Sequence, residues 1–216
     1  IKIDLLGLGM LSVVEETVDL IIRDKDPSID LSRINFDDST VYDSICAGDT
    51  IGVFQIESRA QIAMLPRTKP KNLNDLAIQV SIVRPGPIVG GAVNPYIQRR
   101  EKKLLSSDYE PPYAHPDLRP VLAETLGVVI FQEQVIQVVQ AFAGFTAGEA
   151  DNFRRTLGRK SGLAEINGYR EKFLNAALKK GVTSQSAIDI FNNLLGFAQF
   201  EFPKSHGTAF ALLAYQ

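Results

Sequence analysis

The sequence predicts a mainly α-helical fold with a few short strands. Apolar residues recur at helical spacing through most of the chain, and capping residues, glycines and prolines separate these stretches. The 216 residues are 45% hydrophobic and 22% charged, fractions that are typical of an ordinary globular protein. A chain of this length forms one or two domains and can bury a sizeable core without disulfides or a structural metal.

The N-terminal part combines a strand, a helix and an acidic stretch. Residues 1–6 alternate apolar and polar side chains, as in a strand, and Gly7 and Gly9 mark the change to a helix. Residues 24–50 are acidic and contain several turn formers, so we expect an irregular segment with one short helix. The chain opens without a methionine, and we interpret it as a fragment of a longer protein.

The middle of the chain is expected to alternate short helices with tight connections. Residues 51–56 predict a short strand or extended run, after which Ser58 caps a brief helix that stops at Pro66. Asn72 or Asn74 begins the next helix, which ends before the following proline.

The rest of the chain reads as a series of capped helices. Asn94 is expected to cap a helix with a basic outer face, because Pro95 suits the first helical position. Thr146 and Glu149 stand at the spacing of a capping box, so another helix starts there. Further helices are expected near residues 132, 166, 183 and 205. Three of the helices are predicted to end at a glycine: Gly144, Gly158 and Gly181.

Several classes of site are excluded by composition. Cys46 is the single cysteine and His115 and His206 are the two histidines, so carboxylates are the metal ligands that remain. The sequence has neither a G-x-x-x-x-G-K-[ST] phosphate loop nor an H-E-x-x-H motif. No apolar run approaches the ~20 residues that a bilayer demands, and no signal pattern opens the chain. We therefore predict a cytoplasmic protein without a membrane partner.

Charge is segregated along the chain. Residues 15–49 carry ten acids and three bases, whereas residues 151–216 carry five acids and nine bases. Eight of those nine bases lie between Arg154 and Lys180. Such a block can attract phosphates even on an acidic protein, although a solvated helix face would have the same composition.

Arg154 and Arg155 lie off the apolar stripe of the helix that is expected to begin at Thr146. Guanidinium pairs fork onto phosphate oxygens, so these two could neutralise a triphosphate. They could instead form ordinary surface ion pairs, since Asp151 precedes Arg155 by four residues. Both interpretations stay open from the residues alone.

Two further candidates stand at element boundaries. Asp4, with Lys2 on the same strand face, could bind Mg²⁺, but such sites normally use more than one carboxylate or substrate phosphates. Lys204 and His206 stand at a predicted helix start, where backbone N–H groups and a lysine could bind an anion. An isolated carboxylate and an ordinary helix cap are the structural alternatives.

The chain also contains seven ordered motifs: KIDLLGL at 2–8, GVFQIESR at 52–59, VRPGP at 83–87, Gly127 with FQEQ at 131–134, a run from AGF at 143–145 to GRK at 158–160, FPKSH at 202–206, and ALLAYQ at 211–216. Together they resemble the catalytic alpha subunit of bacterial DNA polymerase III, the C family of DNA polymerases. The similarity covers essentially the whole chain.

This resemblance implies a helical fingers domain with a palm-derived terminal strand. Residues 1–50 would be the end of the palm and its connection to the fingers, and residues 51–216 would be the fingers domain. Asp4 matches the third catalytic carboxylate of the palm, whose two partners lie in an Asp-x-Asp segment upstream. In the whole enzyme these carboxylates would hold two Mg²⁺ ions, a site that is incomplete in this chain. Lys2 matches a palm lysine near the triphosphate.

The resemblance also assigns roles in the fingers. Arg154 and Arg155 match arginines that clamp the phosphates of the incoming dNTP. The nucleotide- or template-proximal candidates are Arg84, Lys204 and His206. The implied partners are primer–template DNA and dNTP, with a sliding clamp and other replisome or repair subunits binding outside this chain. By itself the chain is expected to fold without polymerising.

Within the family, residues 64–67, 82–84 and 94–96 resemble the error-prone, damage-tolerant branch. Residues 199–202 read Gln-Phe-Glu-Phe where members usually have Gly-Tyr-Gly-Phe or similar, and Lys204 is associated with replicase-like members. The replicative or error-prone branch therefore stays open from the residues.

A rival interpretation belongs to a different class of protein. A non-catalytic helical nucleic-acid-binding module could use the same basic helix to contact a phosphate backbone. The two interpretations differ in one feature, because only the polymerase requires an Asp-x-Asp pair upstream of residue 1.

Overall fold

The fold is described from a computed structural model, which covers residues 7–84, 87–88, 91–157, 163–198 and 203–216. Helices dominate these ranges, and no strand occurs within them, which confirms the mainly α-helical prediction. The strand expected at residues 1–6, with Lys2 and Asp4, lies outside the described residues. The α-helices are α1 (Leu8–Asp24), α2 (Ser39–Ala47), α3 (Arg59–Thr68), α4 (Leu73–Ile82), α6 (Val93–Leu105), α7 (Arg119–Leu122), α8 (Gln132–Ala143), α9 (Ala147–Leu157), α10 (Leu163–Lys179), α11 (Ser184–Ala198) and α12 (Lys204–Tyr215), with short 3₁₀ helices η1 (Leu31–Arg33) and η2 (Pro116–Leu118).

The helix starts follow the predicted caps. Ser58 Oγ accepts a hydrogen bond from the backbone N–H of Gln61 at 3.3 Å, and α3 begins there. Asn72 caps α4 in the same way, accepting from the N–H of Asp75 at 2.9 Å. Each side chain satisfies a backbone donor that has no partner within the helix, which fixes where the helix begins.

Residues 51–56 form turns, so the strand or extended run expected there is wrong. Gly52 and Gln55 both have positive φ, 82° and 66°, which interrupts an extended backbone. The hydroxyl of Thr50 donates to the carbonyl of Ile56 at 2.7 Å and closes the segment into a compact loop. A short apolar sequence does not reveal this local closure.

Two other predicted boundaries are also wrong. Helix α3 passes Pro66 and ends at Thr68, because proline removes one hydrogen bond only and the next turn closes from the N–H of Lys69 to the carbonyl of Leu65 at 2.9 Å. Helix α6 begins at Val93, ahead of the expected cap Asn94. Pro95 is tolerated in the first turn of α6, because N–H groups of the first turn have no partner within the helix.

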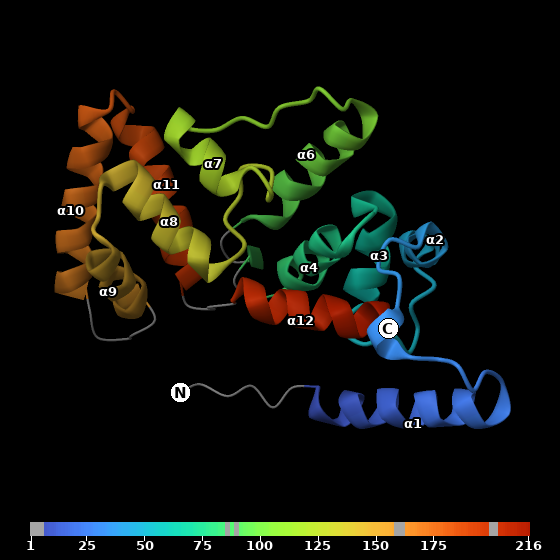
Figure 1. Cartoon of the computed structure of the whole chain (residues 1–216). Helices are drawn as coiled ribbons and strands as arrows, with labels where there is room; N and C mark the ends of the chain where they lie inside the picture. The colour runs from blue at the N-terminus through green and yellow to red at the C-terminus, as the bar shows by residue number, and fades with distance from the viewer. Residues whose placement is uncertain (1–6, 85–86, 89–90, 158–162, 199–202) are drawn as a thin grey trace.

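The helices form two groups joined by a central pair. Figure 1 shows α8, α9, α10 and α11 together at one end of the molecule, α2 and α3 at the other, and α4 against α12 between them. The first group packs around an aromatic core in which four phenylalanines are fully buried: Phe142, Phe153, Phe173 and Phe191. A separate core joins α2, α3 and α4 to α12. Thus α8 and α12 take their apolar support from different clusters.

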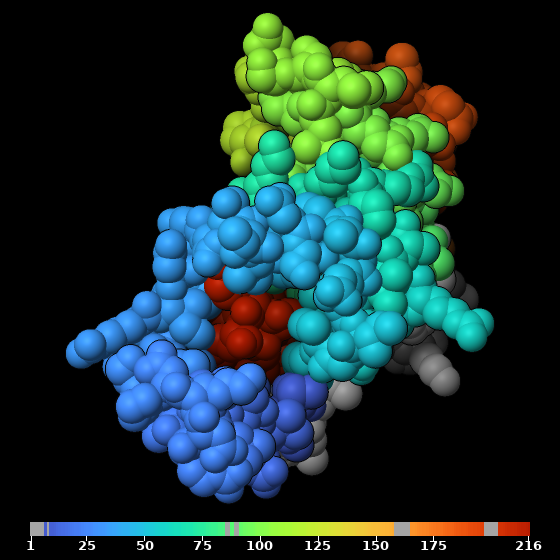
Figure 2. All heavy atoms as spheres, turned by 90° about the vertical axis from the view of Figure 1, so that its right-hand side faces the viewer, coloured from blue at the N-terminus to red at the C-terminus, as the bar shows by residue number. Residues whose placement is uncertain are grey.

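Helix α1 lies apart from the other helices in Figure 1. Leu11 and Val13 are about half exposed on it. Between α1, the segment that follows it and the last turn of α12 lies a cavity of about 370 Å³. Figure 2 shows this region as an opening with α12 at its base.

Candidate nucleotide-binding site

The start of α12 is fixed by a carboxylate from far along the chain. The backbone N–H of Lys204 donates to both carboxylate oxygens of Glu133, at 3.0 and 3.2 Å. Glu133 belongs to the first turn of α8, 71 residues upstream. The Glu133 carboxylate thus lies at this helix start, where a negative charge beside the N-terminal N–H groups is electrostatically favoured.

The side chain of Lys204 is also paired. Its Nζ donates to Glu124 Oε2 at 2.6 Å, and both side chains are 41% exposed. The segment 124–133 thus supplies two acids to one residue of α12. An ammonium group in such an exposed pair can change partners at low cost, because surface ion pairs contribute little to stability.

Arg84 and His206 meet on the ring of Phe210. The guanidinium carbon of Arg84 lies 5.8 Å from the ring centroid, and the His206 ring centroid lies 4.0 Å from it. Arg84 also donates from Nη2 to Gln55 Oε1 at 3.1 Å. A guanidinium over an aromatic face is attracted by the ring, and this contact orients the arginine. Arg84 therefore contacts the middle of α12 through Phe210, whereas Lys204 and His206 stand in its first turn.

The two α9 arginines share a single carboxylate. Arg154 Nη2 lies 2.9 Å from Asp151 Oδ1, and Arg155 Nη2 lies 2.8 Å from Asp151 Oδ2. The hydrogen bond from Arg154 is the main cause that lowers the pKa of Asp151. Arg154 is 20% exposed and Arg155 is 58% exposed. The ion pair considered from the sequence is present, and both arginines take part in it.

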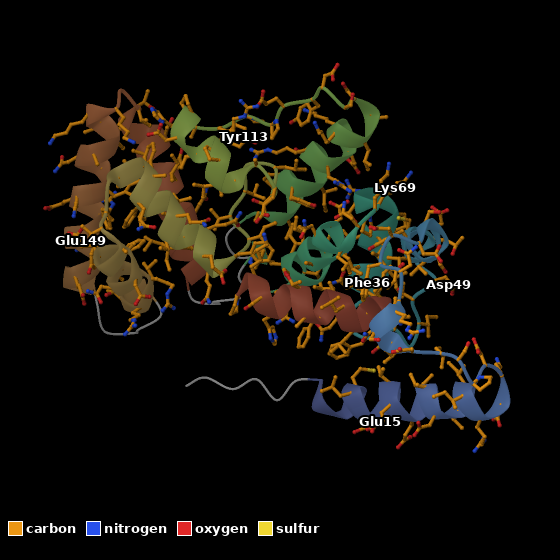
Figure 3. All side chains as sticks on the ribbon, in the orientation of Figure 1. Glu15, Phe36, Asp49, Lys69, Tyr113 and Glu149 are labelled. Atoms are coloured by element: carbon orange, nitrogen blue, oxygen red, sulfur yellow. The ribbon has the colours of Figure 1, made fainter. Side chains whose placement is uncertain are left out.

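The N-terminus of α9 is capped by the predicted capping box. Thr146 N–H donates to Glu149 Oε2 at 2.9 Å, and Glu149 N–H donates to Thr146 Oγ1 at 3.3 Å. Lys172 of α10 donates to the same carboxylate at 2.5 Å, and together these contacts lower the pKa of Glu149 to about 2. Figure 3 labels Glu149 at the α9–α10 end of the molecule and Phe36 toward the opposite end. The ring centroids of Phe36 and Tyr215, the last residue of α12, are 5.3 Å apart.

Helix α8 connects the two groups of basic residues. Its buried side chains pack with those of α9, and its first turn supplies Glu133 to α12. In Figure 1 the start of α8 lies between α9 and the start of α12. Helix α9, which carries Arg154 and Arg155, therefore packs against α8, and Lys204 is bonded to the first turn of α8.

Metal ligands and cavities do not add to this site within the described ranges. No group of three or more His, Cys, Asp or Glu side chains there could hold a metal ion, so the described residues do not fit a Mg²⁺ site. A cavity of about 490 Å³ between α6, α8 and α11 is lined by none of the candidate residues, and the same holds for the cavity beside α1. No described helix is long and apolar enough to cross a membrane.

Sequence reasoning missed the acids and the ring that hold the candidates. Glu133 and Glu124 pair with Lys204, and Phe210 supports Arg84 and His206. Glu133 belongs to a motif that the sequence does single out, at residues 131–134. Its partner is separated by 71 residues, so no periodicity or spacing rule connects the two.

Comparison with known proteins identifies the class. The sequence matches the finger domain of the bacterial DNA polymerase III alpha subunit over residues 10–181. The chain belongs to this family.

The relatives are more specific. The chain is 46% identical over 214 residues to an error-prone DNA polymerase of Allorhizobium ampelinum, covering 99% of this chain and 19% of that protein. It is 45% identical to an error-prone DNA polymerase of Burkholderia mallei (99% of this chain, 21% of the relative) and 46% identical to one of Bordetella bronchiseptica (100% and 20%). The chain thus spans about a fifth of the length of the curated relatives it matches. These relatives confirm the resemblance to the error-prone polymerases.

Proposed function

We propose that this chain is the fingers region, with the end of the palm, of a template-directed DNA polymerase. Residues 1–50 would contain the end of the palm and its connection to the fingers, and residues 51–216 would form the fingers domain. The observation that carries the proposal is that Arg84 packs on Phe210 of α12, the helix that also carries Lys204 and His206 and that Glu133 joins to α8. In such an enzyme these residues would bind the incoming dNTP and the template strand.

Charge supports a triphosphate as the ligand. The α9 arginines are guanidinium groups that suit phosphate oxygens, and the pair with Asp151 keeps both oriented. Arg155, which is the more exposed, can exchange its carboxylate for a phosphate with little loss. Lys204 can leave Glu124 in the same way.

The remaining parts of the site are proposed to come from residues outside the described ranges. Asp4 would act as one metal ligand beside carboxylates from upstream, and Lys2 would lie near the triphosphate. Mg²⁺ would neutralise developing negative charge on the phosphates. Primer–template DNA and dNTP are the proposed partners, with a sliding clamp and other replisome or repair subunits bound elsewhere on the full-length enzyme, which would work in the bacterial cytoplasm.

Primer extension by the full-length polymerase that carries this chain tests the proposal. Asp4→Asn should abolish nucleotide incorporation and leave DNA binding nearly intact, because the change removes a metal ligand and keeps the side-chain shape. Asp19→Asn, at an exposed position of α1, is the matched control and should leave extension unchanged. Incorporation by Asp4→Asn within about tenfold of wild type, only ~1.4 kcal/mol of barrier, would overturn the assignment of Asp4 as a metal ligand. A wild-type enzyme that extends no primer would favour the non-catalytic nucleic-acid-binding module.

A further inference from the structure

We propose that Glu133 is a positioning residue of the nucleotide site, which holds the start of α12 against α8 so that both groups of basic residues can reach one triphosphate. The proposal rests on the proposed polymerase function for the identity of the ligand. Its structural basis is the pair of hydrogen bonds from the N–H of Lys204 to the Glu133 carboxylate.

Glu133 stands on a rigid base. The neighbouring Gln134 is 2% exposed, and its Oε1 accepts from the N–H groups of Ile130 and Phe131 at 2.8 and 3.1 Å. Its Nε2 donates to Thr125 Oγ1 at 2.8 Å. These buried bonds lock the first turn of α8 to the loop before it, so the carboxylate of Glu133 is presented from a fixed backbone.

On the other side, α8 determines where α9 lies. The two helices share a core cluster, and their packing does not depend on α12. Arg154 and Arg155 lie in the last turn of α9, so the orientation of α9 determines their positions. The buried residues that α8 and α9 contribute to this cluster are Val135, Val138, Val139, Phe142, Ala143, Ala150, Phe153 and Leu157.

Helix α12 takes its position from a different cluster. Phe210 packs with α4 and its neighbours, and at the far end Tyr215 Oη donates to the Asn35 carbonyl at 2.8 Å. The end of α12 that carries Lys204 and His206 is fixed against α8 by the Glu133 carboxylate. This contact joins α12 directly to α8, beside the indirect link through α4, on which α12 packs and whose Ile78 and Ile82 cluster with Ile130 and Phe131.

The two acids that meet Lys204 have different roles. Glu133 binds a backbone N–H and fixes the helix, whereas Glu124 binds Nζ, which would have to leave it to meet a phosphate. Loss of Glu133 should weaken nucleotide binding, because it releases the helix start. Glu171→Gln is the control, because it removes an acid from an exposed position of α10, away from α12.

Steady-state dNTP titration on primed DNA with the full-length polymerase tests the inference. Glu133→Ala should raise the KM for dNTP about tenfold or more, because misplacement of ligand-binding groups is costly, with the Kd for primer–template DNA within about twofold of wild type. Glu133→Gln, which keeps an oxygen acceptor, should recover part of the loss. Glu171→Gln should stay within about threefold of wild type. A KM for Glu133→Ala within about twofold of wild type would overturn the inference.

Hydrogen exchange on the same variants separates this inference from the proposed function. In Glu133→Ala, amides in the first turn of α12 should exchange faster than in wild type, whereas those of α9 should keep their protection. Unchanged exchange at the start of α12 would overturn the positioning role, whatever the kinetics. A wild-type enzyme that does not extend primers would instead overturn the polymerase function, and the exchange result would still decide the role of Glu133.

Discussion

The basic residues of α9 and those of α12 are held in opposite ways. Arg154 and Arg155 pair with Asp151 three and four positions earlier in the same helix. Lys204 pairs with Glu124 and Glu133, which are 80 and 71 positions away. Local pairs orient side chains on one helix, whereas distant pairs fix one helix relative to another. The geometry of a site shared by both helices therefore depends most on the distant contacts.

Truncation of a buried aromatic residue is expected to lower the free energy of unfolding more than any other change considered. Phe153 is fully buried, with the rings of Tyr169 and Phe191 at 5.3 and 5.8 Å, and Phe210 is 5% exposed. Phe153→Ala should lower the free energy of unfolding of this chain by about 3–5 kcal/mol, through lost burial and a residual cavity.

Phe210→Leu separates the support of the basic residues from the stability of the core. It keeps most of the apolar volume and removes the ring that Arg84 and His206 contact. It should cost less stability than Phe153→Ala and still weaken dNTP binding in the full-length enzyme. Urea unfolding and dNTP titration measure the two effects. A loss below about 1 kcal/mol for Phe153→Ala would show that this core does not anchor α9.

The α9 capping box gives the smallest expected effect. The pKa of Glu149 is lowered from 4.5 to about 2 by Lys172 and Thr146, so its stabilising contribution is present above the unfolded pKa and is lost as the pH falls toward 2. Glu149→Gln should therefore lower the melting temperature at pH 7 and have less effect at about pH 3. Glu16→Gln, on the exposed surface of α1, is the control. Equal decreases in melting temperature at both pH values would contradict a stabilising role for the ionised Glu149 carboxylate.

The sequence predicts most of the helices because their signals are local. Asn72 caps α4 and Thr146 caps α9 through side chains within three residues of their partners. Gly144 ends α8 with φ 66°, a conformation that glycine adopts at little cost. The turn at residues 51–56 was not predicted, because it depends on Thr50 reaching the carbonyl of Ile56.

The candidate site was predictable as a set of basic residues but not as an arrangement. Guanidinium pairs and a lysine at a helix start make phosphate binding one of the interpretations that the residue types allow. Their supports come from tertiary packing: Phe210 beneath Arg84 and His206, and Glu133 at the start of α12. Such contacts join residues that no local pattern relates.

We propose that the α9 arginines, besides pairing with Asp151, bind the phosphates of the incoming nucleotide. Steady-state dNTP titration of Arg155→Ala in the full-length polymerase tests it most directly, beside Arg33→Ala, which removes an exposed pair with Asp30 at 3.3 Å. Loss of a charge-assisted phosphate contact of ~1.5 to 3 kcal/mol should lower kcat/KM for dNTP by about tenfold or more in Arg155→Ala, with no change in the control. Unchanged nucleotide kinetics in Arg155→Ala, with a slightly lowered melting temperature, would mean that the arginine only stabilises its own helix.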